Sequence, residues 1–149
     1  MTEYAHDPAV EDPFGHHAGP FEIKEVPRPE GGVTRWFGCK IKDHHTNGGG
    51  RAHGGLTMTI ADEAMGAAAW EAIGDDPAFT VSLKVDFVGA VKVGQWLEAA
   101  ADLVSVTKSL VFVQGRLYAD GHVIGHASGV WKRVDPTLFA HFDPAKKRD

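Results

Sequence analysis

The chain has 149 residues, of which 43% are hydrophobic and 23% charged, a composition typical of one folded globular domain. Its 15 Lys and Arg against 20 Asp and Glu give a formal net charge of −5, which repels polyanions and argues against nucleic acid as a partner. No stretch approaches the roughly 20 consecutive apolar residues that cross a bilayer, and the first residues lack the basic and apolar regions of a secretory signal. With a single cysteine, Cys39, the sequence predicts a soluble cytoplasmic protein without a membrane partner.

Prolines distinguish the first 30 residues from the rest of the chain. They stand among charged and small residues at Pro8, Pro13, Pro20, Pro27 and Pro29. Because proline fixes φ and carries no N–H donor, this pattern predicts an extended surface arm over residues 1–32 rather than a regular element. A solvated tail is expected over residues 135–149. Residues 33–134 are left as the folded domain.

A strand is predicted over Val33–Ile41, where β-branched and aromatic residues are frequent. Five glycines in ten positions then predict a loop over Thr46–Gly55. The proline-free, alanine-rich run Leu56–Ile73 predicts a long helix, and its thin polar face indicates that a sheet encloses it. Four further strands follow, with Asp120-Gly121 as a hairpin turn between the last two: Thr80–Phe87, Gln95–Val104, Leu110–Tyr118 and His122–Val134.

This order of elements predicts an α+β domain with an antiparallel sheet. A single helix covers only one face of such a sheet, so the other face meets solvent or packs on a partner.

The run His53-Gly54-Gly55 lies where the predicted loop becomes the predicted helix. The first N–H groups of a helix have no acceptor within the helix, so the amides of Gly54 and Gly55 are free to point at a ligand oxygen. Together with the positive end of the helix dipole, they favour the oxyanion that develops when a nucleophile adds to a thioester or ester carbonyl. On spacing alone, a glycine-rich helix entry without function explains the same run.

Asp62 stands two turns further along the helix among apolar residues, where a carboxylate is costly unless it is paired or used. It is a candidate to attack a thioester or to act as general base on a water. Glu63 is turned about 100° around the helix axis, so the two carboxylates do not share a face. A partly exposed structural position suits Glu63 better, although it keeps a lesser claim to the catalytic role.

These residues resemble a known family. Asn47, the run His53-Gly54-Gly55 and Asp62, followed by a small-residue helix, the strand Ser82–Phe87 (SLKVDF) and Gly94, are similar to the hotdog-fold acyl-CoA thioesterases of the PaaI-like group. The likeness runs from about Val33 to Val134. It implies a sheet wrapped around one long central helix, hydrolysis of an acyl-CoA thioester to free acid and CoA, and no cofactor beyond the CoA of the substrate.

The resemblance also implies roles for single residues. Asp62 falls on the nucleophile or general base of the family, and Gly54 on the backbone donor to the thioester oxygen. Asn47 and His53 fall on residues that orient the thioester and the attacking water. A hydroxyl group early in the strand after the helix assists in some members, and Thr80 matches it.

Ser82 is the less favoured match for that hydroxyl. The resemblance further implies that two protomers join their sheets, so that each site combines the Asn-HGG loop of one chain with the aspartate of the other. A homodimer and a homotetramer both remain open, and the acyl group is not readable from the sequence.

Residues expected to contact the substrate lie outside the catalytic set. Gly55 belongs to the helix entry, and the turn that contains Val88 and Gly89 would touch the nucleotide or pantetheine of CoA. Lys92 and Arg51 would lie near its phosphates. Alternatively, Lys92 is a solvated lysine at a strand end and has no functional role.

Three other functions fit parts of the pattern. A hotdog-fold dehydratase or hydratase would pair His53 with Asp62 for proton transfer, but its longer acidic-histidine signature is absent. A nonenzymatic acyl-CoA binding protein would be favoured by loss of Asp62, which is present. A metal site of His44, His45 and His53 lacks ligand spacing, so no metal is expected.

Overall fold

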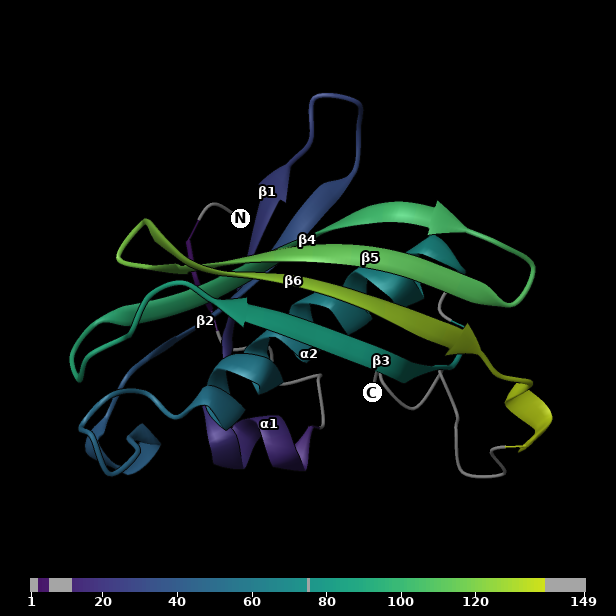
Figure 1. Cartoon of the computed structure of the whole chain (residues 1–149). Coiled ribbons are helices and arrows are strands. Elements are labelled where there is room, and N and C mark those ends of the chain that lie inside the picture. Colours follow the sequence, from purple (N-terminus) through teal and green to yellow (C-terminus); the bar gives the residue numbers. More distant parts are fainter. Residues whose placement is uncertain (1–2, 6–11, 75, 139–149) are drawn as a thin grey trace.

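The computed structural model describes residues 3–5, 12–74 and 76–138 (Figure 1). Six antiparallel strands form one sheet in the order β1-β2-β4-β5-β6-β3, and the long helix α2 (Gly54–Ala72) lies against one face of it. The strands are β1 (Glu22–Pro27), β2 (Val33–Lys40), β3 (Ala78–Phe87), β4 (Trp96–Val106), β5 (Leu110–Ala119) and β6 (His122–Arg133). The predicted α+β class, with an antiparallel sheet around one central helix, is confirmed.

Small side chains let α2 lie close to the sheet. Ile60, Ala61, Ala64, Met65 and Ala69 are buried along it, as expected for a helix enclosed by strands. On the facing strand, a Cβ at Gly115 would lie 2.9 Å from the sulfur of Met65, so glycine at that position makes room for the helix. The helix ends before Gly74, whose φ of 71° is the left-handed conformation that often follows a helix.

The hairpin predicted at Asp120-Gly121 is confirmed. Asp120 (φ 47°) and Gly121 (φ 81°) both adopt the left-handed conformation required at the centre of a tight hairpin turn between β5 and β6. The Asp120 carboxylate also accepts the Trp96 amide at 2.9 Å, which ties this turn to the start of β4.

The N-terminal prediction is wrong over residues 13–27. α1 (Pro13–Ala18) packs on α2, and β1 pairs with β2 as an edge strand of the sheet. The prolines are compatible with these elements because Pro13 opens α1, where no N–H is needed, and Pro27 is the last residue of an edge strand. The expected C-terminal tail includes the short 3-10 helix η2 (Pro136–Leu138), and its residues 139–149 lie outside the described part of the chain.

β3 forms the other edge of the sheet, and its register decides which side chains face α2. A bulge between Thr80 and Ser82 shifts the pairing with β6: Thr80 lies opposite the buried Trp131, whereas Ser82 lies opposite Val130. Thr80 and Phe87 therefore face α2, and Ser82 faces the outer side of the sheet. Several apolar side chains along this edge are exposed, namely Phe79, Val81, Phe87 and Val88.

Within the described residues, no helix combines the length and apolarity needed to cross a membrane.

Candidate active site

The first turn of α2 presents one free backbone donor. His53 caps the helix, because its Nδ1 accepts the Gly55 amide at 2.9 Å. For Gly54, no hydrogen bond from its amide to any described residue is found. The expectation that both glycine amides are available is thus wrong for Gly55, whose N–H is used by the ring two residues before it. Gly54 alone offers its N–H at the positive end of the helix dipole.

The cap also fixes the tautomer of the neutral His53 ring. Because Nδ1 accepts a hydrogen bond, the proton of the neutral imidazole lies on Nε2, which makes Nε2–H a donor. His53 is an exposed residue, so its ring is open to solvent. The ring is thereby suited to hydrogen-bond an oxygen and unsuited to accept a proton at Nδ1.

Asn47 holds the glycine-rich loop in shape. Its Oδ1 accepts the amides of Gly49 at 2.9 Å and Arg51 at 3.3 Å, and its own amide donates to the carbonyl of Arg51 at 2.8 Å. The side-chain oxygen is therefore occupied by the loop. What Asn47 has left for a ligand is its NH₂ group, which is a donor.

Asp62 is half-buried in the middle of α2 and faces the edge strand β3. Its Oδ1 accepts a hydrogen bond of 2.9 Å from the hydroxyl of Thr80. The bulge after Thr80 turns Ser82 to the opposite face of the sheet, so the structure brings Thr80 to Asp62 and does not bring Ser82 there. One carboxylate oxygen is held in place by this hydrogen bond.

Glu63 lies beside Asp62 in sequence but faces α1. Burial, together with smaller contributions from the neighbouring carboxyl groups of Asp12 and Asp62, raises the pKa of Glu63 to about 7. The side chain of Asp12, just before α1, hydrogen-bonds Glu63. Sequence reasoning did not find this carboxyl pair, because it depends on the docking of a helix that was not predicted.

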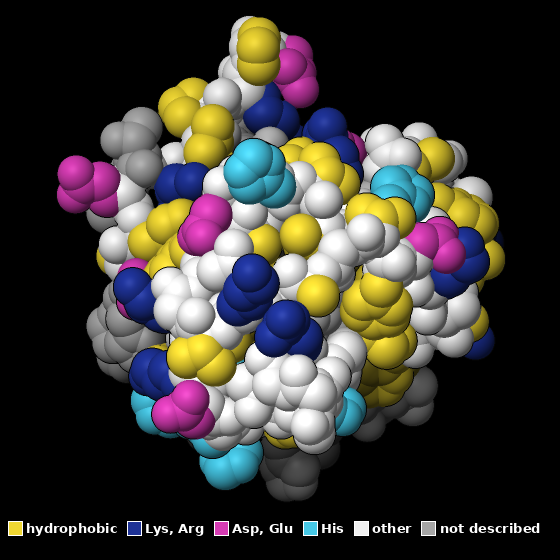
Figure 2. All heavy atoms as spheres, turned by 60° about the vertical axis from the view of Figure 1, so that its left-hand side comes forward, with side chains coloured by type: hydrophobic (Ala, Val, Ile, Leu, Met, Phe, Trp, Pro, Cys, Tyr) yellow, Lys and Arg dark blue, Asp and Glu magenta, His cyan; other side chains and the backbone are white. Residues whose placement is uncertain are grey.

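Basic side chains meet at the end of the molecule that carries the loop before α2. A backbone bridge pairs Arg51 with Lys92, although they are far apart in sequence, and both are exposed. Figure 2 shows this end, with Lys and Arg side chains spread across it. Val88 and Gly89 follow β3 nearby and donate their amides to the carbonyl of Ile124 at 2.9 and 3.1 Å. The contacts expected with CoA thus come from neighbouring loops.

Neither a metal site nor a reactive thiol has matching geometry among the described residues. No group of three His, Cys, Asp or Glu side chains there is placed to hold a metal ion, and His45 is buried in the 3-10 helix η1 (Asp43–His45). Burial raises the pKa of the Cys39 thiol to about 12, which keeps it protonated and unreactive.

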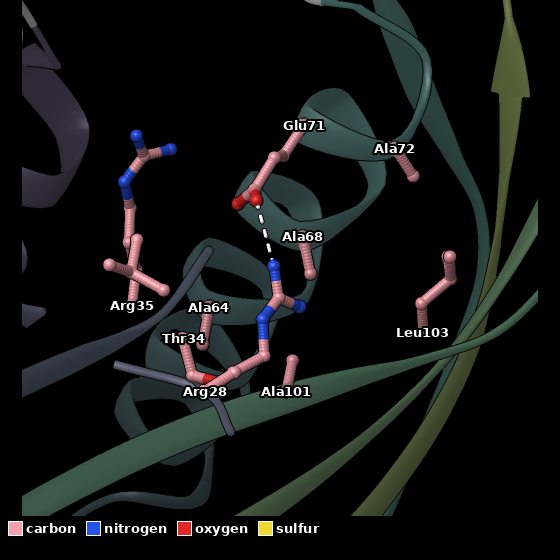
Figure 3. A pocket seen from close by; sticks show the side chains of 10 residues that line it. Arg28, Thr34, Arg35, Ala64, Ala68, Glu71, Ala72, Ala101 and Leu103 are labelled. Carbon is pink, nitrogen blue, oxygen red and sulfur yellow. Dashed lines mark hydrogen bonds and ion pairs between the residues drawn. The ribbon is translucent and has the colours of Figure 1, made fainter. Parts of the chain in front are cut away.

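A pocket of about 130 Å³ lies on the other flank of α2, between this helix and the β1–β2 hairpin (Figure 3). Ala64, Ala68 and Ala72 form its helix wall, and an ion pair of 3.0 Å between Arg28 and Glu71 spans it. Ala64 is turned about 200° around the helix from Asp62, so this pocket and the Asp62 side chain lie on different sides of α2.

Comparison with known proteins identifies the family of this chain. The family model described as the thioesterase superfamily matches residues 49–125. The Pseudomonas aeruginosa protein named "Putative esterase PA0474" is 38% identical over 93 residues, covering 62% of this chain and 69% of that protein. Acyl-coenzyme A thioesterase 13 of Mus musculus is 27% identical over 95 residues, which cover 58% of this chain and 68% of the mouse protein.

Among solved structures, the BH2602 protein of Bacillus halodurans with CoA has a TM-score of 0.63 and 27% identity, covering 66% of this chain and 70% of that one. The matched residues 49–125 include the helix entry at Gly54, Asp62 and Thr80. The predicted hotdog fold and family are confirmed: the chain belongs to the thioesterase superfamily of thioester hydrolases.

Proposed function

We propose that this protein hydrolyses an acyl-CoA thioester to a carboxylic acid and CoA, with Asp62 as the acting carboxylate and the Gly54 amide as the donor to the thioester oxygen. The observation that carries the proposal is the hydrogen bond of 2.9 Å from Thr80 to Asp62, which holds a half-buried carboxylate on the helix that starts with a free amide. A carboxylate kept in place beside an open sheet edge is better explained by chemistry than by packing.

The two groups cannot serve one thioester within a single chain. Gly54 and Asp62 are eight positions apart on the same helix, which separates them by about 12 Å along its axis. A reacting carbonyl must lie roughly 3 Å from both its donor and its attacking group. Each site therefore takes Gly54 from one chain and Asp62 from another.

The open edge of β3 supplies the contact for such a dimer. Two identical strands related by a two-fold axis pair antiparallel, so the start of one β3 lies beside the end of the other. Thr80 is near the start of β3 and Phe87 at its end, and a Cβ at Gly54 would lie 3.6 Å from the Phe87 ring. Pairing of the two edges thus brings Asp62 and Thr80 of one chain toward Gly54 of its partner, and it covers the exposed apolar side chains of β3.

In the reaction, the carbonyl oxygen accepts the Gly54 amide while the carbonyl carbon is attacked. Either Asp62 attacks it directly, or Asp62 removes a proton from a water whose hydroxide adds to the carbon. In the water route the C–S bond then breaks, the acid is released, and the thiolate of CoA takes up the proton that Asp62 removed from the water. In direct attack the C–S bond breaks to leave an anhydride between the acyl group and Asp62; a water then hydrolyses this anhydride, which releases the acid, restores the Asp62 carboxylate and supplies the proton of the CoA thiol. The amide and the helix dipole stabilise the negative oxygen in both routes. His53 Nε2–H and the NH₂ of Asn47 are the further donors that orient the thioester or the water.

Positive charge near the loop before α2 favours CoA as the thiol half of the substrate. Arg51 and Lys92 are exposed and adjacent, and they lie near the loop that leads to Gly54. Two neighbouring cations are suited to the phosphates of CoA. The names of the mouse relative and of the structure solved with CoA agree with this choice of substrate.

The test compares Asp62→Asn with Glu63→Gln on a panel of acyl-CoA substrates, measured by release of free thiol. Asp62→Asn keeps the volume of the side chain but removes its charge, so we expect the rate to fall at least ~10²-fold while substrate binding survives. Glu63→Gln should retain activity. A normal rate for Asp62→Asn would disprove the assignment, provided that thermal unfolding shows both variants folded, and a loss confined to Glu63→Gln would move the role to that residue.

A further inference from the structure

Phe87 is an aromatic side chain that the proposed chemistry does not use. It ends β3 and faces α2, yet its side chain is 51% exposed. A half-exposed phenylalanine on an edge strand costs free energy in water. The first residue of α2 is among its neighbours.

The tip of the Phe87 ring lies against Gly54. An ideal Cβ on Gly54 would lie 3.6 Å from Cζ and 3.8 Å from Cε1 of the ring, and apart from its chain neighbours and the nearby backbone of α2 no other atom of the described residues lies within 4 Å. Gly54 is also the residue whose amide has no acceptor among the described residues. An apolar ring therefore lies against the residue that carries the free backbone donor of the first turn of α2.

We propose that Phe87 is a positioning residue of the oxyanion site: its ring forms an apolar wall that keeps water away from the Gly54 amide and holds the thioester oxygen on that amide. This inference rests on the proposed thioester hydrolysis. A hydrogen bond to a developing negative charge is stronger where water is excluded and the local dielectric is low. The effect of the wall is thus felt in the transition state more than in substrate binding.

The same strand then contributes to both halves of the reaction. Near its start, Thr80 holds the Asp62 carboxylate through a bond of 2.9 Å, and at its end Phe87 lies against Gly54. In the dimer described above, these two ends come from different chains at each site. Phe87 would lie beside the bound thioester of its own Gly54 and close to the partner's carboxylate.

The first measurement needs no substrate. Solvent exchange of the Gly54 amide, followed by NMR in the full-length protein, reports directly on water access to that N–H. We expect the exchange rate to rise several-fold in Phe87→Ala and to stay near the native value in Phe87→Leu, which keeps an apolar group at the position.

The second measurement is the steady-state rate on an acyl-CoA, with the oligomeric state followed by sedimentation. Phe87→Ala should lower kcat about 10-fold while KM changes less than about 3-fold, and Phe87→Leu should recover most of kcat. Phe79→Ala is the matched control, because Phe79 is a similarly exposed aromatic (53%) at the other end of β3. It should leave the exchange of the Gly54 amide unchanged.

Unchanged amide exchange together with unchanged kcat in Phe87→Ala would overturn the inference. A loss of kcat that follows only from dissociation of the protein would overturn it as well, since Phe87 would then be an interface residue. Faster exchange in Phe87→Ala without any thioesterase activity in the native protein would support the wall and count against the proposed function.

Discussion

The two flanks of α2 are built in different ways, although the same helix supplies both. The flank toward β1 and β2 is closed by a hairpin and by the ion pair between Arg28 and Glu71, and its helix wall consists of alanines. The flank toward β3 has a free amide at Gly54, a carboxylate at Asp62 and exposed apolar side chains on an edge strand, which pairs only with β6. On the β3 flank, groups that a stable monomer would pair or bury are left open.

The proposed function assigns the β3 flank to a ligand and a second chain, and the other flank to packing. The variants below alter one flank or the other, and the comparison predicts large effects on activity at the β3 flank and small effects on stability at the other.

The largest effect is expected from Gly54→Ala. The added methyl group would lie at an ordinary contact distance of 3.6 Å from Phe87, so the protein should fold with an unchanged melting temperature. The methyl would nevertheless occupy the space beside the amide where the thioester must approach, and we expect hydrolysis to fall about 10²-fold, as for loss of an oxyanion donor. Calorimetry and initial rates measure the two effects, and normal turnover would remove Gly54 from the site.

Mixing two inactive variants tests whether the flank is shared between chains. Gly54→Ala and Asp62→Asn homodimers should each be nearly inactive, whereas a heterodimer has one site with both native groups. Random exchange of subunits should restore about a quarter of the native rate, since half of the dimers then carry one intact site of two. No recovery after verified subunit exchange would exclude the two-chain site.

Thr80→Val should reduce hydrolysis about 10-fold. Valine keeps the shape of threonine but removes the hydroxyl that bonds to Asp62, and hydrogen bonds to charged groups contribute about 1.5 to 3 kcal/mol. Ser82→Ala is the matched control, because the bulge places Ser82 on the outer face of the sheet. Equal losses of initial rate in the two variants would mean that the hydrogen bond from Thr80 to Asp62 does not contribute to hydrolysis.

Stability should decrease with rising pH because of Glu63. Its pKa in the folded protein is about 7 against an ordinary value of 4.5, so the folded state binds the proton more tightly than the unfolded chain does. The free energy of unfolding therefore declines between about pH 4.5 and 7 and levels off above that range. The groups that face Glu63 are Asp12 beside α1 and Asp62 on the same helix.

Glu63→Gln imitates the protonated side chain, and melting temperatures across this pH range should show a flatter decline than in the native protein. Identical profiles for the native protein and the variant would assign the pH dependence to other groups.

The smallest effect is expected on the closed flank. Glu71→Gln breaks a partly exposed ion pair with Arg28, so denaturant unfolding should show a loss of about 0.2 to 1 kcal/mol. Hydrolysis should be unaffected. A large loss of activity would show that the pocket beside Arg28 takes part in the reaction and that the contrast between the flanks is misplaced.

Several site features were predictable because they depend on residues close together in sequence. Gly54 opens a helix wherever the run after it is a good helix former, and Asp62 follows on that helix at a fixed rise per residue. Thr80 was preferred over Ser82 only through the family resemblance, since alternation in a regular strand would put both on one face. The bulge between them separates the two, and it arises from pairing with β6.

Local sequence failed where an element depends on a distant partner. The proline-rich start predicts an extended arm, but β1 is stabilised by pairing with β2, and α1 is stabilised by packing on α2. The pairing of Glu63 with Asp12 follows from that packing and could not be anticipated without it.

By itself, the sequence determined the α+β class, the long enclosed helix, the hairpin at Asp120-Gly121 and the positions of Gly54 and Asp62, because periodicity, turn chemistry and helix geometry are local properties. Tertiary structure alone decided that the Gly55 amide is taken by His53, that Ser82 faces away from Asp62, that Arg51 meets Lys92 and that Phe87 lies against Gly54. Each of these depends on ring orientation, strand register or contact between distant segments, which only the packed chain specifies.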